Sequence, residues 1–501
     1  MKKNYLFLAL FYCLTLPAQD FEGKLKMEVR KAIENIKEFV AIPNDANDHS
    51  NIMRNINWLT GQFTSRGFNT AVIPTEGEPL FFAVRPMVEE LPTVLFYMHF
   101  DGQPVDPGKW DQADPYKVVL KKEVDDKWVN EEWSTLNENL NYESRLFGRS
   151  VSDDKGPIVM LLSALDLMKA ENQKIPFNIK VILDGEEEKG SKPLTNTVKR
   201  NQELLEADFL IINDGPVHAS GKPTIAYGCR GITTLEITTY GPLMPQHSGH
   251  FGNYAPNPGF QLAQLLASMK DTEGRVIIEG YYKGIELDDD TKAILNKVPD
   301  DEEALKERLS FKIPEKVGNS YQESLQYPSL NIRGLSSGWV GKQARTIVPD
   351  MATAAIDIRL VPESDGEQLK LLVKKHIEKQ GYKVLSGEPG TEERKKYDRI
   401  ATVRETPVTA PFRTDMSNSY AVWASNVLTS VYGQEPVKIR IMGGTVPTAS
   451  FVNILDIPAV IIPLVNPDNN QHSPNENLKI AQISYGINTF YALLTSELPK
   501  F

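Results

Sequence analysis

Short apolar runs rich in β-branched and aromatic residues recur along the chain, and each leads into polar residues. The runs cover residues 93–98, 179–183, 209–212 and 459–465. Runs of this length and composition predict buried β-strands. The stretch at 157–171 is long enough for a crossover helix, and Pro157 suits its first turn. This alternation predicts an α/β fold with a mostly parallel sheet flanked by helices.

The middle of the chain has a different pattern. Residues 225–240 and 352–360 alternate between apolar and polar positions, as strands with one exposed face do, and a charged stretch at 288–316 lies between them. We therefore expect an α+β domain inserted at a surface loop of the first domain. The expected boundaries are 19–221 and 405–501 for the two parts of the catalytic domain, and 222–404 for the insertion.

The first residues have the layout of an export signal. Lys2 and Lys3 precede an apolar run at 5–16, which predicts a signal peptide over 1–18 and a periplasmic or extracellular protein. The run is shorter than the ~20 residues that span a bilayer, and no other stretch approaches that length, so we expect no membrane span. Cys13 leaves a lipid anchor as an alternative, although bulky residues precede it. Without residues 1–18 only Cys229 remains, which excludes an intrachain disulfide.

The charge balance narrows the possible partners. The formal net charge is −11 and the pI is about 5.4. Nucleic-acid binding relies on clustered Lys and Arg that neutralise phosphates, and the sequence has no such cluster. The acidic balance therefore indicates a solvated surface and argues against a nucleic-acid partner.

Residues that can bind a metal follow the predicted strands. Ligands of open α/β sheets gather at the carboxyl ends of the strands, so we expect these side chains to share one site. They are His99, Asp101, Asp153, the acidic run 184–188, Asp214 and His472. Most of them have a commoner explanation when taken singly, such as a buried core histidine, a loop carboxylate, a helix N-cap or a turn residue.

The acidic run is the hardest of these features to explain without a metal. Glu186, Glu187 and Glu188 are consecutive and follow a predicted buried strand, so their mutual repulsion would raise the pKa of some of them. A divalent cation would convert this repulsion into binding, with one carboxylate left free as a base. A solvated acidic turn is the alternative.

Five segments, in this order, resemble those of a known enzyme family. They are His-x-Asp at 99–101, Gly-Arg-x-x-x-Asp-Asp-Lys-Gly-Pro at 148–157, Glu-Glu-x-Gly-Ser at 187–191, the strand-end Asp214, and His-Ser-x-Asn-Glu at 472–476. The family is that of the co-catalytic zinc metallopeptidases, which includes carnosinases, nonspecific dipeptidases, glutamate carboxypeptidases and aminoacylases. The chain most resembles the carnosinase-like dipeptidase branch, over nearly all of the sequence that follows the signal.

The resemblance implies a role for each residue of the expected site. The implied ligands are His99 and Asp214 for one metal ion, Glu188 and His472 for the other, and Asp153 as a bridge between them, followed by a cis peptide bond. Asp101 is expected to orient His99, and Glu187 to act as the general base on a metal-bridged water. Two divalent ions are implied, and mixed imidazole and carboxylate ligands suit zinc, with manganese or cobalt as alternatives.

The inserted segment carries further matches, which imply a lid and dimerisation domain. Gln246–His247 and the following Ser-Gly resemble a family segment whose histidine reaches the active site of the partner subunit, so a homodimer is implied. Pro245 stands where the family has an acid, which leaves the orientation of His247 open. The implied substrate-binding residues are Thr346 and Arg359 of this segment and the later turn Gly443, Gly444 and Thr445. A planar guanidinium suits a substrate carboxylate because it can donate two parallel hydrogen bonds.

Three functions are consistent with these residues. The leading one is a metallodipeptidase that acts on dipeptides or short peptides with a free carboxylate. An N-acyl amino acid amidohydrolase would use the same metals and the same Arg359. A non-catalytic, metal-stabilised binding protein is the third, and Glu187 argues against it because a base that holds no metal has no evident structural duty.

Overall fold

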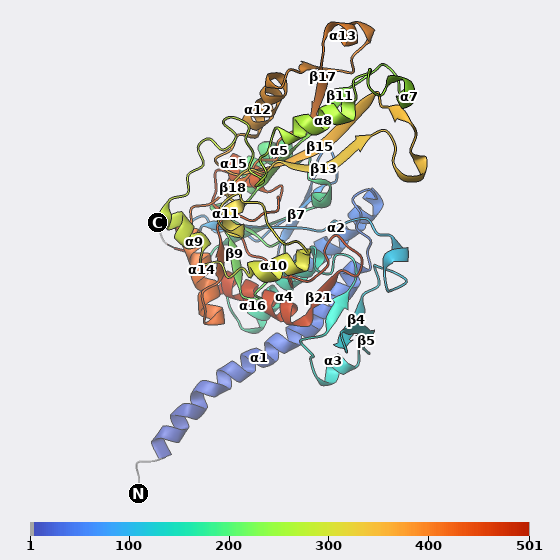
Figure 1. The fold of residues 1–501 in the computed structure, drawn as a ribbon. Coiled ribbons are helices and arrows are strands. Elements are labelled where there is room, and N and C mark those ends of the chain that lie inside the picture. Colours follow the sequence, from blue (N-terminus) through green and yellow to red (C-terminus); the bar gives the residue numbers. More distant parts are fainter. Residues whose placement is uncertain (1–4, 500–501) are drawn as a thin grey trace. The chain divides into compact units, whose positions relative to one another are not determined.

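The computed structural model describes residues 5–499, with side chains from Asp20 onwards. These residues form two compact units, whose elements are labelled in Figure 1. Unit 1 contains the residues up to Tyr227, Thr414–Ile439 and those from Ser450 on, and unit 2 contains Gly228–Arg413 and Arg440–Ala449. The sequence pattern places the insertion at 222–404; unit 2 begins later and also takes in Arg440–Ala449, which the sequence analysis assigns to the catalytic domain.

Helix α1 (Tyr5–Val40) begins inside the predicted signal segment 1–18. Residues 1–4 of that segment lie outside the described residues, and export stays a prediction. Within the described part of the chain, no helix combines the length and the apolar character that crossing a membrane requires.

The core of unit 1 is an eight-stranded sheet with the order β1-β2-β7-β3-β8-β20-β9-β19. Its strands are β1 (Asn69–Ile73), β2 (Leu80–Val84), β3 (Thr93–His99), β7 (Asn178–Asp184), β8 (Phe209–Ile212), β9 (Thr224–Ala226), β19 (Val437–Ile439) and β20 (Ala459–Ile461). The central strands β7, β3, β8 and β20 are parallel, while β2 and β9 join this block in antiparallel fashion. All residues of β3 and β7 are buried, as expected for parallel strands covered on both faces. The predicted α/β class is confirmed.

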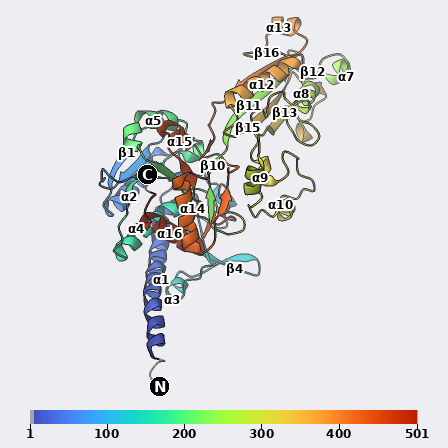
Figure 2. The ribbon, with the colours of Figure 1, turned by 90° about the vertical axis from the view of Figure 1, so that its left-hand side faces the viewer.

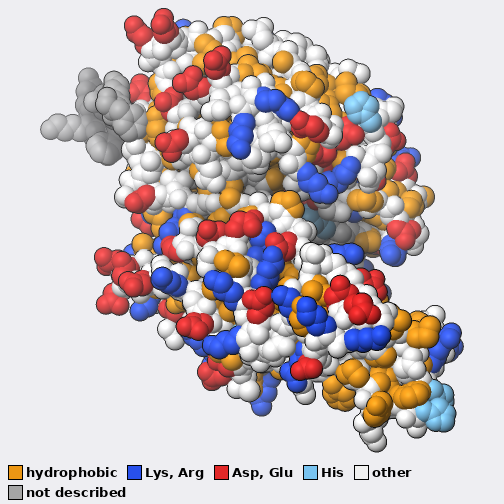
Figure 3. Space-filling model, turned by 90° about the horizontal axis from the view of Figure 1, so that it is seen from above, with side chains coloured by type: hydrophobic (Ala, Val, Ile, Leu, Met, Phe, Trp, Pro, Cys, Tyr) orange, Lys and Arg blue, Asp and Glu red, His pale blue; other side chains and the backbone are white. Residues whose placement is uncertain are grey.

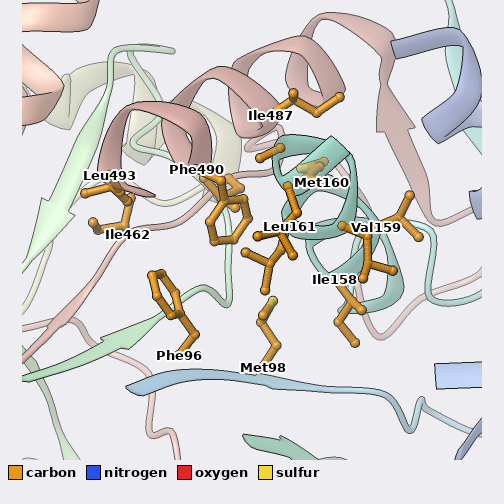
Figure 4. Close-up of a cluster of buried hydrophobic side chains, with 14 of the residues drawn as sticks. Phe96, Met98, Ile158, Val159, Met160, Leu161, Ile462, Ile487, Phe490 and Leu493 are labelled. Carbon is orange, nitrogen blue, oxygen red and sulfur yellow. The ribbon is translucent and has the colours of Figure 1, made fainter. Parts of the chain in front are cut away.

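Helices cover both faces of this sheet. On one face lie α1, α4 (Lys155–Ala170), α14 (Ser419–Tyr432) and α16 (Ile480–Thr495), and apolar side chains of β3, α4 and α16 meet there in Figure 4. The Phe96 and Phe490 rings lie 6.0 Å apart between centroids. On the other face Tyr97 meets Phe451 of α15 (Ala449–Leu455) at 5.6 Å. Helix α2 (His49–Thr64) covers β1 and β2.

A smaller sheet in unit 1 joins two distant loops. Its order is β21-β6-β4-β5, from β4 (Val119–Val124), β5 (Lys127–Asn130), β6 (Arg145–Phe147) and β21 (Asn477–Lys479). Asn477 pairs with Phe147, so the loop before β21 lies beside the turn that follows β6. The remaining short elements of unit 1 are η1 (Pro107–Lys109), α3 (Thr135–Glu138), η2 (Glu187–Lys189), α5 (Leu194–Arg200) and α6 (Gln202–Leu205).

Unit 2 is built on a five-stranded sheet with the order β13-β15-β11-β17-β16. Its strands are β11 (Gly231–Tyr240), β13 (Asn331–Ser337), β15 (Met351–Leu360), β16 (Lys383–Leu385) and β17 (Ile400–Glu405). Burial alternates along β15, and its buried residues pack with the apolar faces of α8 (Pro258–Ala267) and α12 (Gly366–Lys379). Figure 2 shows α12 lying along this sheet. The fold is thus α+β, as expected for the insertion.

Short elements complete unit 2. They are β10 (Gly228–Cys229), β12 (Gln246–His247), α7 (Ser248–Phe251), α9 (Asp289–Leu295), α10 (Glu302–Leu309), α11 (Tyr321–Ser324), η3 (Gly341–Gln343), β14 (Ile347–Val348), α13 (Thr391–Lys396) and β18 (Phe412–Arg413). Helices α9 and α10 come from the charged stretch that the sequence analysis singled out at 288–316.

Two predicted strands differ from the structure. The alternating run at 225–240 splits into β9, β10 and β11, because Gly228 and Gly231 lie against crossing backbone: a Cβ would meet Phe412 O at 2.1 Å and Thr409 O at 2.4 Å respectively. The run at 459–465 forms regular strand only over Ala459–Ile461. Pro463 has no N–H to continue the ladder, although the chain stays extended enough for Val217 to donate to Val465 O at 2.9 Å.

Candidate active site

The ends of three parallel strands bring the predicted metal-binding residues of unit 1 together. His99 is the last residue of β3 and pairs with Asp184, the last residue of β7. Asp214 follows the end of β8, the next strand in the sheet. Because the strands are parallel and in register, the side chains that end them converge at one edge, as the sequence pattern predicts.

The turn before α4 supplies Asp153. The Asp153–Asp154 peptide bond is cis, as the resemblance implies, and α4 begins at the next residue. The turn is held by Glu476, a fully buried carboxylate from the loop before β21. Its Oε1 accepts hydrogen bonds from the backbone N–H of Ser152 (3.0 Å) and Asp153 (3.1 Å) and from the Ser152 hydroxyl (2.8 Å), and its Oε2 from the backbone N–H of Ser150 (2.9 Å) and from Arg149 (2.8 Å).

Two groups of potential ligands share Asp153. One group is His99, Asp153 and Asp214, and the other is Asp153, Glu188 and His472; in each, the candidate ligand atoms lie within 4.8 Å of one another. Nε2 of His99 lies 2.9 Å from Oδ1 of Asp153, and Nε2 of His472 lies 3.0 Å from its Oδ2. Nε2 of His472 also lies 3.1 Å from Oε2 of Glu188. Asp153 thus contacts both histidines, one through each oxygen.

The chemistry of this donor set fits two divalent cations. Asp153 Oδ2 is buried and accepts no well-aligned hydrogen bond from the described residues, despite the nearby imidazole. A buried carboxylate oxygen in this state is stabilised by a cation. Two imidazoles and three carboxylates match the ligands that zinc takes in proteins. The residues present therefore fit the implied metal pair.

The pKa values of the histidines show how strongly this cluster favours positive charge. Burial alone would lower the pKa of His99, but Asp101 and Asp153 raise it well above its usual value. Asp153 and Glu188 raise the pKa of His472 to about 10. Burial would raise the pKa of Asp153, yet the two histidines hold it below its usual range. The metal-free cluster thus retains protons that a bound cation would release.

Asp101 has a wider role than the orientation of His99. Its Oδ1 lies 3.3 Å from Nδ1 of His99, a contact longer than a strong hydrogen bond. Its two oxygens also accept the backbone N–H groups of Glu187 (3.0 Å) and Glu188 (3.1 Å) at the start of η2. Burial raises the pKa of Asp101 to about 7. This one carboxylate therefore places a histidine and the whole acidic turn.

Glu187 stands apart from the ligand groups. Its carboxylate belongs to neither group of candidate ligands and accepts no hydrogen bond from the described side chains or backbone. Glu188, by contrast, contacts His472 and accepts a 2.7 Å hydrogen bond from Gln103. Burial and the neighbouring Asp214 and Asp101 raise the pKa of Glu187 well above its usual value. A carboxylate in this setting has the raised proton affinity that a general base requires.

In unit 2 the structure joins Arg359 to Thr445. Arg359 lies on β15, and its Nη1 donates a 2.6 Å hydrogen bond to the Thr445 hydroxyl. By sequence, Gly443, Gly444 and Thr445 are expected in the second part of the catalytic domain, whereas in the structure they belong to compact unit 2. The turn is tied to unit 2 because the Arg230 N–H donates to Met442 O at 3.1 Å and to Gly444 O at 3.2 Å.

His247 and Thr346 also lie together in unit 2. His247 pairs with Ile347 across β12 and β14, and the Ser248 N–H donates to Thr346 O at 3.0 Å. Nδ1 of His247 accepts the Gly249 N–H at 3.1 Å. Because Nδ1 accepts this hydrogen bond, Nε2 is the ring nitrogen that can act as a donor. The local backbone thus fixes the ring although Pro245 replaces the family's acid.

Sequence reasoning missed two residues that hold the site. In the sequence, Glu476 is only the last residue of the His-Ser-x-Asn-Glu motif, and Gln103 follows His-x-Asp without an implied role. The signal that the sequence offers for Glu476 is its position, since it is an acidic residue four positions after the predicted ligand His472. Nothing in the sequence indicates that its oxygens point to a turn more than three hundred residues earlier.

Comparisons with known proteins agree with this geometry. The sequence model of a family described as Peptidase family M20/M25/M40 matches residues 95–496. The chain is 29% identical over 417 residues to the Cys-Gly metallodipeptidase of Saccharomyces cerevisiae, covering 81% of this chain and 80% of the relative. It is 29% identical over 394 residues to human Beta-Ala-His dipeptidase, covering 77% and 71%.

Solved structures with the same fold cover nearly the whole chain. The M20 family metallo-carboxypeptidase Sso-CP2 from Sulfolobus solfataricus has a TM-score of 0.76 and 28% identity, covering 93% of this chain and 98% of that one. Human carnosine dipeptidase 1 has a TM-score of 0.73 and 25% identity, covering 95% and 98%.

Proposed function

We propose, from the premise that this chain belongs to peptidase family M20/M25/M40, that it is a dipeptidase acting on dipeptides or short peptides with a free carboxylate. Membership of the family makes the chain a metallopeptidase. The observation that carries the proposal is the division within one acidic turn: Glu188 contacts His472 in a ligand group, whereas Glu187 belongs to neither group.

The residues of unit 1 supply what amide hydrolysis needs. Two divalent ions, which we propose to be zinc, would lower the pKa of a water molecule towards neutrality and polarise the scissile carbonyl. Glu187 takes the proton of the attacking water and passes it to the leaving nitrogen. Asp101 accepts the backbone N–H of Glu187 and so fixes the backbone from which the base projects.

The residues of unit 2 support a substrate with a free carboxylate. The guanidinium of Arg359 is held by the Thr445 hydroxyl at 2.6 Å, and Gly443 and Gly444 directly precede Thr445 in the chain. A positioned guanidinium and backbone donors form a carboxylate-binding set. The named activities of the relatives, on Cys-Gly and Beta-Ala-His, concern dipeptides with such a carboxylate.

A substrate panel tests the proposal. We would compare Cys-Gly and β-Ala-His with their carboxyl-terminal amides and with N-acetyl amino acids, before and after dialysis against a chelator and re-addition of zinc, manganese or cobalt. We expect dipeptides to turn over faster than their amides and activity to return with the metal. Faster hydrolysis of N-acetyl amino acids would favour the deacylase alternative, and two bound ions without any hydrolysis would favour a binding protein.

We also propose a homodimer in which His247 acts across the interface. Strand β13 is an edge strand, and its apolar residues Ile332 and Leu335 are 44% and 64% exposed. Exposed edges with apolar side chains pair with another chain. Figure 3 shows exposed apolar side chains gathered beside a histidine at the lower right of that view. Because Nδ1 of His247 accepts a hydrogen bond from its own turn, Nε2 is the ring nitrogen that could donate to the substrate's carbonyl oxygen.

Mixing two inactive variants tests the action of His247 across subunits. In a heterodimer of Glu187→Gln and His247→Ala chains, one active site would combine an intact base with an intact histidine, so mixing should restore activity. No restoration in verified heterodimers would place the histidine in its own subunit's site. Leu335→Glu should yield monomers in light scattering, whereas Leu204→Glu, at an exposed position of unit 1, should not.

We further propose that the chain is exported, on the basis of its first 18 residues. Cell fractionation and determination of the mature N-terminus would test this. A mature chain that begins near Gln19 is expected, while a chain that begins at a lipid-modified Cys13 would identify a lipoprotein.

A further inference from the structure

Unit 2 contains a cavity of about 610 Å³ that has no part in the function proposed above. Its lining residues come from the strand end near Leu330, from the segment around Val276, and from residues 302–320, which contain α10. Residues 302–320 are called the lobe below. This volume is in the range of cavities that hold whole small molecules. Neither Arg359 nor Thr445 lines it, although Ser329 of its wall donates a backbone hydrogen bond to Arg359 O at 3.1 Å.

Arg230 is the unusual residue of the cavity wall. Its side chain is 6% exposed, and its one side-chain hydrogen bond runs from Nη2 to Tyr327 O at 2.6 Å. Its Nε is buried and has no hydrogen-bond partner among the described residues. Burial lowers the pKa of Arg230 to about 10, so the group is still charged at neutral pH. A buried cation without a carboxylate partner is costly unless an anion binds it.

The other cations of the cavity are already paired. Lys270 contacts Glu315 at 2.8 Å, and Lys316 contacts Glu273 at 2.7 Å. These pairs also tie the lobe to the segment that precedes Val276. Lys306 also lines the cavity and contacts Glu303, and the carboxylate of Glu302 accepts the Tyr321 N–H at 2.8 Å. Among the described residues of the wall, Arg230 is thus the cation without a carboxylate partner, which matches a single negative charge better than the double charge of a phosphate.

Another part of the cavity wall is apolar and poorly covered by protein. Leu309, Phe311 and Ile313 line it, yet they are 55%, 40% and 73% exposed. Helix α10 has no buried residue. Apolar side chains that gather around a cavity and remain in contact with water gain free energy when an apolar ligand covers them.

We propose that this cavity binds a small amphiphilic monocarboxylate, whose carboxylate pairs with Arg230 and whose apolar part covers Leu309, Phe311 and Ile313. The site is separate from the Arg359 and Thr445 pair and does not depend on the proposed dipeptidase activity. The backbone N–H of Arg230 donates to Met442 O and Gly444 O. The ligand would therefore contact the same residue whose backbone holds the substrate-binding turn.

Calorimetric titration of the full-length, metal-loaded protein with octanoate tests the proposal. We expect saturable binding of octanoate, at least about tenfold tighter than binding of octan-1-ol or octylammonium. The reason is that a charged carboxylate accepts stronger hydrogen bonds from Arg230 than a hydroxyl does, and an ammonium group accepts none. Inorganic phosphate should not compete. Octanol binding as tightly as octanoate, or phosphate competing with octanoate, would overturn the proposal.

Matched variants locate the carboxylate. Arg230→Gln should weaken octanoate binding about tenfold or more, Arg230→Lys should restore part of it, and Lys270→Gln should change it by less than about twofold since Lys270 is already paired. Equal losses in Arg230→Gln and Lys270→Gln would contradict the assignment. Arg359→Gln should leave octanoate binding intact; its loss there would mean that the acid occupies the substrate site.

A second pair of variants covers the case in which Arg230→Gln does not fold. Leu309→Gln, at an exposed position of α10, should weaken octanoate binding about threefold or more, because less apolar surface is covered. Arg308→Gln lies on the same helix, does not line the cavity, and should leave binding unchanged. If both variants bind octanoate like the unmodified protein, the apolar wall is not part of a site and the proposal is wrong.

Discussion

In unit 1 four of the five expected metal ligands stand at the ends of buried strands or in turns tied by buried carboxylates, the exception being His472, whereas in unit 2 His247 and Thr346 lie on short, exposed segments. Asp101 and Glu476 together accept hydrogen bonds from five backbone N–H groups around the ligands. His247, in contrast, lies on a two-residue ribbon, Thr346 comes directly before the second strand of that ribbon, and both residues are exposed. The difference indicates that the metal centre is preorganised by its own unit, while the substrate groups are arranged by a few local contacts.

The strongest test of this contrast is Glu187→Gln. The variant should keep both metal ions, because Glu187 belongs to neither ligand group, but lose about 10³-fold or more in kcat because no base remains. Metal content and steady-state kinetics would be measured together. Glu186→Gln is the matched control: its carboxylate accepts the Glu78 N–H at 3.0 Å, and kcat should fall less than about tenfold. Full activity in Glu187→Gln would contradict the role of Glu187 as the general base.

Glu476→Gln tests whether preorganisation of the metal centre comes from the buried carboxylate. The amide can accept only part of the five hydrogen bonds, so the turn that carries Asp153 should loosen and metal affinity should drop about 10–100-fold. Competition with a chromogenic chelator would measure this. Glu143→Gln, which removes a largely exposed partner of Lys479, should leave affinity unchanged. Equal metal affinities in Glu476→Gln and the unmodified protein would show that the turn keeps its conformation without the Glu476 carboxylate.

Arg359→Gln probes the locally arranged group of unit 2. It should raise KM for a dipeptide by about tenfold or more with a smaller change in kcat, because a charge-assisted hydrogen bond to the substrate carboxylate is lost in ground and transition states alike. Thr445→Val removes only the hydroxyl that holds Arg359 and should raise KM less. An effect confined to kcat would contradict a carboxylate-binding role. The same variants assayed on a peptide amide should lose little.

The smallest expected effect is the pH dependence of the metal-free protein. Burial raises the pKa of Asp101 to about 7 and of Asp214 to about 6, and carboxylate neighbours raise that of His472 to about 10. The folded chain then holds more protons than the unfolded chain, between about pH 4 and 7 for the acids and between about pH 6.5 and 10 for the histidine. These groups therefore make stability fall as pH rises.

Melting curves of chelator-treated protein at pH 5 and pH 9 would measure this effect. We expect a melting temperature a few degrees lower at pH 9 and a larger stabilisation by zinc there, since the cation replaces the protons. Asp214→Asn should flatten the profile. A metal-free melting temperature that rises from pH 5 to pH 9 would show that other groups dominate.

The residues that meet at the candidate metal site are easier to predict from the sequence than the limits of the compact units, for physical reasons. A run such as 93–98 must be buried, and a polar residue at its end must face the sheet edge, so His99 could be placed from local pattern alone. Glu476 could not be placed, because its role comes from pairing between Asn477 and Phe147 across the small sheet. The limits of unit 2 depend on the close approach of the backbone at Gly228 to that of Phe412, and on the packing of Arg440–Ala449 with unit 2. Local periodicity in the sequence predicts neither contact.

Strand β20 determines when unit 1 can be completed during synthesis. It lies between β8 and β9 in the sheet, although it follows them in the chain by more than two hundred residues. Until the ribosome has released Ala459–Ile461, β8 has an open edge, and His472 and Glu476 are still to come. Pairing over such a separation is slow because the intervening chain must first be brought together. The nascent polypeptide therefore lacks a complete candidate metal site until His472 and Glu476 have been synthesised.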